Sequence, residues 1–156
     1  MVAIVDSGPG RRGPEACRGI AAELAASGSR VVIVNVEALL RTNRIPEVNA
    51  FVPGRAPNVS LWPPEAAAPV EFFQSPTEVP ASEDWLGSLR QGFDSVILDC
   101  PAADSAPAAA GIAAIADATV LVVEARRTSK RQIQRTQRTL QLRGAKLAGF
   151  ILMRKR

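Results

Sequence analysis

The 156-residue sequence contains no histidine and no tyrosine, and its last acidic residue is Glu124. Without histidine, the chain lacks the commonest general base at neutral pH, which excludes histidine-dependent triads and metal sites built on imidazole. Without tyrosine, it cannot phosphorylate itself on that residue. The two cysteines, Cys17 and Cys100, are far apart and belong to no Cys-x-x-Cys motif, so they predict buried free thiols rather than a zinc or redox site.

Long apolar runs are also missing. The longest, such as residues 118–123, are far shorter than the roughly 18–20 residues of a membrane span, and residues 1–6 lack the basic start of a signal peptide. A hydrophobic fraction of 47% with 22% charged residues is nevertheless enough to build a core. We therefore expect one soluble domain over residues 1–156, in the cytoplasm.

Charge is divided unevenly along the chain. The total is +4, but residues 1–124 hold all 15 acidic and only eight basic residues, a net of −7. Residues 125–156 hold the other eleven basic residues, a net of +11. A segment of one sign can attract an acidic protein, an anionic membrane or nucleic acid. The opposite charges of the two parts make self-association a further expectation to test.

Short runs rich in Val and Ile alternate with Ala- or Leu-rich stretches. The runs are continuously apolar, which is typical of strands that are buried on both faces of a parallel sheet. The alternation predicts a three-layer α/β fold with a mostly parallel central sheet. The predicted strands are Val2–Val5, Val31–Val34, Asn58–Trp62, Val96–Leu98, Thr119–Val123 and Ala148–Leu152. The predicted helices are Pro14–Ser27, Ser82–Gln91, Ala106–Ile115 and Ser129–Leu142.

Residues 45–80 interrupt this alternation, because eight of the twelve prolines fall there. Proline removes a backbone donor and restricts the preceding residue, so the segment cannot form one long helix. We expect a long excursion from the domain, with one short strand inside it. The apolar Phe72 and Phe73 predict that the excursion folds back onto the body.

A glycine-rich loop follows the first predicted strand. In an open parallel sheet, ligands bind beyond the carboxyl ends of the strands, and a glycine loop that opens a helix is where backbone amides cradle a phosphate. This loop, residues 7–15, lacks the Gly-Lys-Ser/Thr ending of a working phosphate loop, since Gly13 is followed by Pro14 and Glu15. Glu15 also places a negative charge in the first helical turn, where it competes with a bound anion.

The order of these segments resembles the bacterial tyrosine kinases of capsule and exopolysaccharide export, which belong with the MinD/ParA type of ATPase. The resemblance covers nearly the whole chain: the glycine loop is followed by Val31–Glu37, Phe93–Pro101, Ala116–Val123 and Gly144–Leu152. The most specific piece is Phe93–Pro101, because the family's Walker B motif is an apolar strand that ends in Asp and is followed shortly by Pro. The resemblance implies a P-loop NTPase-like fold, with ATP and Mg²⁺ as the cofactors if nucleotide binding survives.

Matched position by position, the chain keeps the scaffold and loses the chemistry. Asp99 corresponds to the Asp that organises Mg²⁺, and Glu37 is the one carboxylate left of a two-carboxylate motif that begins here with Asn35. The residues after Gly13 are not the family's Lys and hydroxyl residue, and Met153 stands where many relatives have an adenine-binding Asn. The resemblance therefore implies a pseudoenzyme, a binding or regulatory component of polysaccharide export whose partner is a membrane-anchored protein.

An active ATPase or kinase is the alternative. Arg11 and Arg12 could replace the missing Lys, because a guanidinium binds phosphate through two hydrogen bonds. The nucleotide site would then consist of Gly10, Arg11, Arg12, Gly13 and Glu37, with Asp99 as the Mg²⁺ ligand and the one catalytic candidate. Otherwise the two arginines are solvated loop charges, and Asp99 is an inherited strand-end residue.

The last predicted helix carries a basic face. Arg131, Arg135 and Arg138 follow i, i+4, i+7 spacing and share one side, while Ile133 and Leu140 lie opposite. Such a face is either solvated or a contact surface. No aromatic residue lies in 125–149, so any contact with nucleic acid would be to phosphate. We expect a protein partner here, and binding to DNA or to an anionic membrane, as in ParA and MinD, is the alternative.

Overall fold

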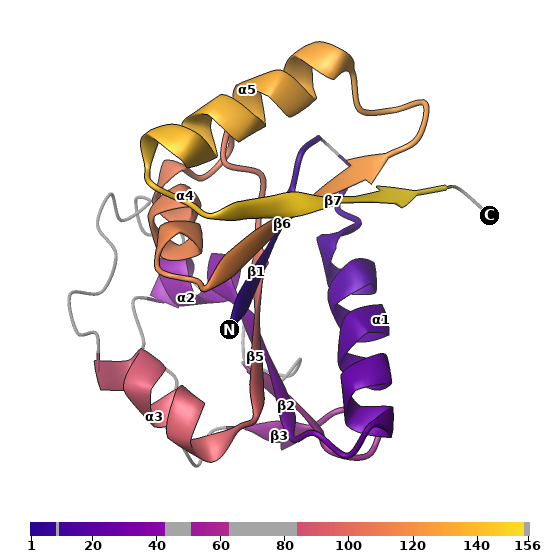
Figure 1. Cartoon of the computed structure of the whole chain (residues 1–156), viewed down its shortest axis with the longest axis vertical. Helices are drawn as coiled ribbons and strands as arrows, with labels where there is room; N and C mark the ends of the chain where they lie inside the picture. Colours follow the sequence, from indigo (N-terminus) through magenta and orange to yellow (C-terminus); the bar gives the residue numbers. More distant parts are fainter. Residues whose placement is uncertain (9, 43–50, 63–83, 155–156) are drawn as a thin grey trace.

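The computed structural model describes residues 1–8, 10–42, 51–62 and 84–154 (Figure 1). Its seven-stranded sheet has the order β3-β4-β2-β5-β1-β6-β7. Every neighbouring pair is parallel except β3 with β4. The predicted α/β class and the mostly parallel sheet are therefore confirmed. The predicted helix start at Ser82 and the fold-back by Phe72 and Phe73 lie outside the described residues.

The strands are β1 (Val2–Asp6), β2 (Val31–Asn35), β3 (Val52–Pro53), β4 (Val59–Trp62), β5 (Ser95–Cys100), β6 (Ala118–Glu124) and β7 (Leu147–Met153). The helices are α1 (Gly13–Ala26), α2 (Val36–Thr42), α3 (Asp84–Gly92), α4 (Pro107–Ala114) and α5 (Lys130–Leu142). Among these helices, none combines the length and apolarity that a membrane crossing needs.

Helices cover both faces of the sheet, and each face has its own core. On one face, α1 packs its small residues Ala16, Cys17 and Ala21 against β1, β2 and β5. On the other face, α2, α3, α4 and α5 contribute to a larger core around the opposite side chains of the same strands (Figure 1). Successive strand residues point to opposite faces, so β1 sends Ile4 into the first core and Val5 into the second. The three central strands are therefore buried on both sides, as their continuous apolar runs predict.

Helix α2 corrects the sequence prediction, which placed a loop directly after β2. The helix begins at Val36, and the Asn35 side chain closes its first turn by accepting a hydrogen bond from Ala38 N at 3.0 Å. Val36, Leu39 and Leu40 are buried, at the i, i+3, i+4 spacing of an inward helix face. Asn35 therefore serves as a helix cap.

Strand β7 corrects a second prediction. Its apolar run predicts burial on both faces, but β7 is the last strand of the sheet and pairs only with β6 among the described strands. Phe150 is 69% exposed and Leu152 is 51% exposed. An apolar run of this kind does not reveal whether anything covers it, because composition alone is the same for a central strand and an edge strand.

Helix α5 gives a matched test of the second core. Leu140 is fully buried, whereas Leu142 on the same helix is 78% exposed. We expect Leu140→Ala to lower the free energy of unfolding by about 2–5 kcal/mol, because it removes buried apolar area and leaves a cavity. Leu142→Ala should change the free energy by less than about 0.5 kcal/mol. Urea unfolding of both variants measures the two values, and equal losses would contradict this packing.

Candidate functional site

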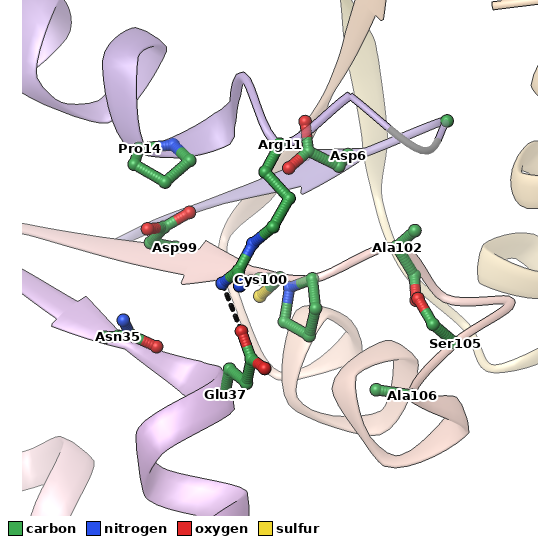
Figure 2. Close-up of a pocket in the computed structure, with 12 residues that line it drawn as sticks. Asp6, Arg11, Pro14, Asn35, Glu37, Asp99, Cys100, Ala102, Ser105 and Ala106 are labelled. Atoms are coloured by element: carbon green, nitrogen blue, oxygen red, sulfur yellow. Dashed lines mark hydrogen bonds and ion pairs between the residues drawn. The ribbon is translucent and has the colours of Figure 1, made fainter.

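A cavity of about 270 Å³ lies at the carboxyl ends of β1, β2 and β5, where sequence reasoning expects a ligand (Figure 2). Its walls come from the loop before α1, the first turn of α2 and the loop between β5 and α4. The charged and polar side chains in the wall are Asp6, Arg11, Asn35, Glu37, Asp99 and Ser105. Three carboxyl groups against one guanidinium make this cavity acidic.

Asp6 is the last residue of β1, and its side chain is turned into the glycine loop. It is 4% exposed, and its Oδ1 accepts a hydrogen bond from Gly13 N at 2.9 Å. Burial raises the pKa of Asp6 to about 6, and the charge of nearby Asp99 acts in the same direction, while the Gly13 N–H lowers it. Near neutral pH the Asp6 carboxyl group is mostly ionised, so a negatively charged oxygen accepts one of the loop's backbone N–H groups.

Asp99 lies beside Asp6, on the adjacent strand β5. Both carboxyl groups lie close to Gly13: a Cβ atom at this position would be 3.0 Å from an oxygen of each. Burial raises the pKa of Asp99 to about 6, although a hydrogen bond from the Cys17 thiol lowers it. Burial also raises the pKa of Cys17, which keeps the thiol protonated and able to donate. Cys17 is thus the predicted buried thiol, with Asp99 as its acceptor.

Glu124 closes the loop from the other side. It ends β6, it is 4% exposed, and its Oε2 makes no hydrogen bond within the described part of the chain. A Cβ atom at Gly10 would lie 1.9 Å from this oxygen, so a larger residue there would require the Glu124 side chain to move. Arg127 Nη1 is 3.6 Å from the other oxygen, Oε1. The carboxyl group of Glu124 therefore fills space beside the loop backbone.

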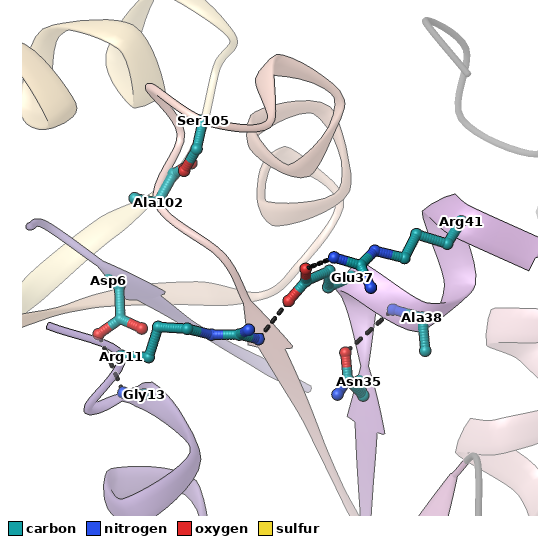
Figure 3. A network of polar contacts seen from close by, with 9 residues as sticks. All are labelled: Asp6, Arg11, Gly13, Asn35, Glu37, Ala38, Arg41, Ala102 and Ser105. Carbon is teal, nitrogen blue, oxygen red and sulfur yellow. Dashed lines mark hydrogen bonds and ion pairs between the residues drawn. The ribbon is translucent and has the colours of Figure 1, made fainter. Parts of the chain in front are cut away.

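Arg11 crosses the cavity and pairs with Glu37 (Figure 2). Glu37 also pairs with Arg41 one turn later on α2, at 2.5 Å (Figure 3). The carboxylate of Glu37 thus lies between two guanidinium groups and ties the glycine loop to α2. The guanidinium of Arg11 thus neutralises part of the negative charge of the cavity wall.

Arg12 points to a different place. Its Nη2 lies 3.0 Å from the Glu15 carboxylate and 3.4 Å from the backbone oxygen of Arg154, beyond the end of β7. Its Nε is buried and makes no hydrogen bond within the described residues. Arg12 therefore links the loop to the end of the last strand and does not line the cavity.

Of the predicted site residues, the fold brings Arg11, Glu37 and Asp99 together in the cavity wall. Gly10 and Gly13 lie in the same loop, and each faces a carboxyl group. Sequence reasoning assigned no role to Asp6 or to Glu124. One signal was available for both, since each is an acidic residue that ends an apolar strand.

The basic face on α5 is a separate feature. Arg131, Arg135 and Arg138 line a second cavity of about 700 Å³, together with Asp104 from the loop before α4. Arg135 Nε lies 3.3 Å from Asp104. Arg131 and Arg138 form no ion pair with the described residues. The face is therefore partly neutralised at its centre and positive at both ends.

The loop in this conformation does not fit the phosphates of a nucleotide. A phosphate loop offers backbone N–H groups to the anion, but here Gly13 N–H is donated to Asp6 and Arg12 N–H to Gly10 O at 2.8 Å. Among the described residues, no three His, Cys, Asp or Glu side chains gather closely enough to hold a metal ion. Two backbone N–H groups that a phosphate would need are therefore already taken by acceptors of the loop and of Asp6.

No protein-family model matches the sequence, and no curated protein does. Solved structures do match its fold. The BceF tyrosine kinase domain superposes with a TM-score of 0.73 and 20% identity, over 97% of this chain and 67% of that one. The MinD cell division protein of Aquifex aeolicus superposes with a TM-score of 0.64 and 16% identity, over 99% and 69%.

A third match is cobyrinic acid a,c-diamide synthase from Mycobacterium smegmatis, in a structure with bound ADP and magnesium. It superposes with a TM-score of 0.66 and 17% identity, over 97% of this chain and 74% of that one. The chain therefore has the fold of bacterial tyrosine kinase domains and of MinD-type P-loop ATPases, as its sequence resemblance implies.

The raised pKa of Asp99 predicts a stability effect with a definite sign. Its pKa is about 6 in the folded protein against an ordinary value of 3.8 for Asp, so the folded state binds more protons between these values and loses stability as the pH rises through them. We expect the unfolding free energy of Asp99→Asn, relative to wild type, to rise by about 1–3 kcal/mol between about pH 4 and about pH 7.5. Urea unfolding at both pH values measures this difference.

Asp94→Asn is the matched control. The pKa of exposed Asp94 is lowered by its hydrogen bonds with Arg30, so this carboxylate contributes stability above its unfolded pKa. That contribution is lost mainly below about pH 4, so the relative stability of Asp94→Asn should stay nearly constant between about pH 4 and about pH 7.5. Equal slopes for the two variants would contradict the burial of Asp99.

Proposed function

We propose that this chain is a binding or regulatory component with a bacterial tyrosine kinase fold and without nucleotide chemistry. The observation that carries the proposal is the filled glycine loop: Asp6 takes the Gly13 N–H, and Glu124 lies against Gly10. These two carboxyl groups stand where a phosphate would need donors and positive charge.

The negative charge of the cavity also disfavours nucleotide binding. Two unit charges about 4 Å apart interact by roughly 4 kcal/mol at the effective dielectric near a protein surface. An incoming triphosphate would meet Asp6 and Asp99, both mostly ionised above pH 6, with Arg11 already committed to Glu37. Without a phosphate-loop Lys, little electrostatic stabilisation is left for a transferring phosphoryl group.

The proposed setting is bacterial polysaccharide export, in the cytoplasm and at the inner membrane. Its support is the sequence resemblance to the kinases of capsule and exopolysaccharide export, together with the shared fold. The partner would be a membrane-anchored export protein, bound through Arg131, Arg135 and Arg138. A regulatory component of this kind needs the folded scaffold but no active nucleotide site.

Calorimetric titration with ATP and Mg²⁺ tests the loss of nucleotide chemistry. We expect no binding at micromolar concentrations, because two backbone donors of the loop are taken and the cavity is acidic. An active ATPase or kinase would instead bind ATP in this range and turn it over. Turnover that Asp99→Ala abolishes would contradict the proposal directly.

A second candidate function is binding of an anionic surface, DNA or membrane, through the face on α5. The observation in its favour is that Arg131 and Arg138 form no ion pair within the described residues, while both line one cavity. Each phosphate contact contributes about −0.9 to the slope of log K against log salt on duplex DNA. Replacing all three arginines of the face by Ala should make that slope shallower by about 2–3.

Binding to duplex DNA and to anionic vesicles, measured across a salt series, checks this candidate. The matched control removes three exposed arginines elsewhere, Arg18, Arg30 and Arg90. If the two triple variants lose equal affinity, net charge explains the binding and the face has no specific role. If neither anion binds at low salt, this candidate is excluded.

A further inference from the structure

Among the described residues, no strand pairs with the outer edge of β7. Natural sheets guard such edges with charged residues, proline, bulges or a covering element, and β7 has only a register shift at Ala148, near its start. Residues 147–153 contain no charged residue and no proline, and β7 pairs only with β6 among the described strands. Phe150 and Leu152 are two residues apart, both are more than half exposed, and they share one face of the strand. The edge therefore offers backbone hydrogen-bonding groups beside exposed apolar side chains.

Positive charge lies at both ends of this edge. Arg143 and Lys146 precede the strand and are exposed, and Arg154 follows it and is exposed. Arg126 lies at the same end as Arg154, because the preceding Ala125 donates its N–H to Met153 O at 2.8 Å. None of these four side chains forms an ion pair with the described residues. The edge is thus apolar in the middle and basic at both ends.

This pattern disfavours two other occupants. A second copy paired antiparallel along β7 would bring the basic start of one strand against the basic end of the other, which is destabilising. A lipid surface could cover Phe150 and Leu152 but could not satisfy the backbone N–H and C=O groups of the edge. An extended peptide satisfies both the backbone and the apolar side chains.

We propose that β7 binds an extended segment of a partner protein as an eighth strand, and that this segment combines apolar residues with acidic ones. The partner's backbone would pair with the open edge, its apolar side chains would cover Phe150 and Leu152, and its carboxylates would meet the basic ends. This inference rests on the proposed binding role and names the chemistry of the partner. The test of this inference involves no nucleotide. ATP binding would therefore overturn the proposed function without deciding whether β7 binds a peptide.

The test uses a nine-residue fluorescent peptide of alternating Glu and Val, and a matched peptide with Lys in place of Glu. Anisotropy titration at low salt should show binding of the Glu peptide at least about tenfold tighter than that of the Lys peptide. The affinity should fall as salt rises, because the charges at the ends are exposed. Hydrogen exchange should show new protection of the amides in residues 147–153.

Two variants of exposed apolar residues distinguish specific binding at the β7 edge from nonspecific hydrophobic binding. Phe150→Asp should weaken binding of the Glu peptide at least about tenfold, since it places a like charge against the peptide. Ile115→Asp, at the end of α4 and 39% exposed, should leave the affinity unchanged. Circular dichroism checks that both variants are folded, and Leu152→Asp repeats the test at a second position.

Several results would overturn the proposal. These are failure of the Glu peptide to bind at low salt, binding that Phe150→Asp does not weaken, and binding without new protection in β7. Self-association that Phe150→Asp abolishes would assign the edge to a second copy. Sedimentation with anionic vesicles that the same variant abolishes would assign it to lipid. Either of these last results replaces the partner strand as the occupant.

Discussion

The site depends on one constraint, the pairing of the glycine loop with the protein's own carboxyl groups. Asp6 accepts the Gly13 N–H, and Glu124 lies so close to Gly10 that a larger residue there would require the Glu124 side chain to move. The glycines of the loop therefore make room for buried carboxyl groups. The loop holds two carboxyl groups beside its backbone, and Arg11 crosses the cavity to pair with Glu37.

Sequence patterns predict the frame of the fold better than the contacts of the site. The central strands were predictable because both of their faces are buried, which requires continuous apolar runs. Helix α2 was missed because it follows β2 directly, with Asn35 as its one start signal. The contact of Glu124 with Gly10 joins residues that are far apart in the sequence, and no local pattern encodes such a pairing. The exposure of β7 was missed because an apolar run does not report what covers it.

The basic surplus at the end of the sequence is separate from the acidic cavity. In the loop, Arg11 pairs with Glu37 and Arg12 pairs with Glu15, whereas the basic residues of α5 and of the ends of β7 are largely unpaired within the described residues. Basic side chains that pair with no acid of the domain can interact with an acidic partner. The structure thus combines an acidic cavity with two outward-facing basic surfaces, an arrangement that supports the proposed binding role.

The most direct measurement of the central claim is the amide resonance of Gly13, followed by NMR against pH and then against ATP with Mg²⁺. The account predicts that this resonance titrates with a midpoint of about 6, because its N–H donates to Asp6, whose pKa is about 6. It also predicts no change when ATP and Mg²⁺ are added near neutral pH. A Gly13 resonance that is insensitive to pH in this range, and that shifts saturably with ATP, would contradict the account.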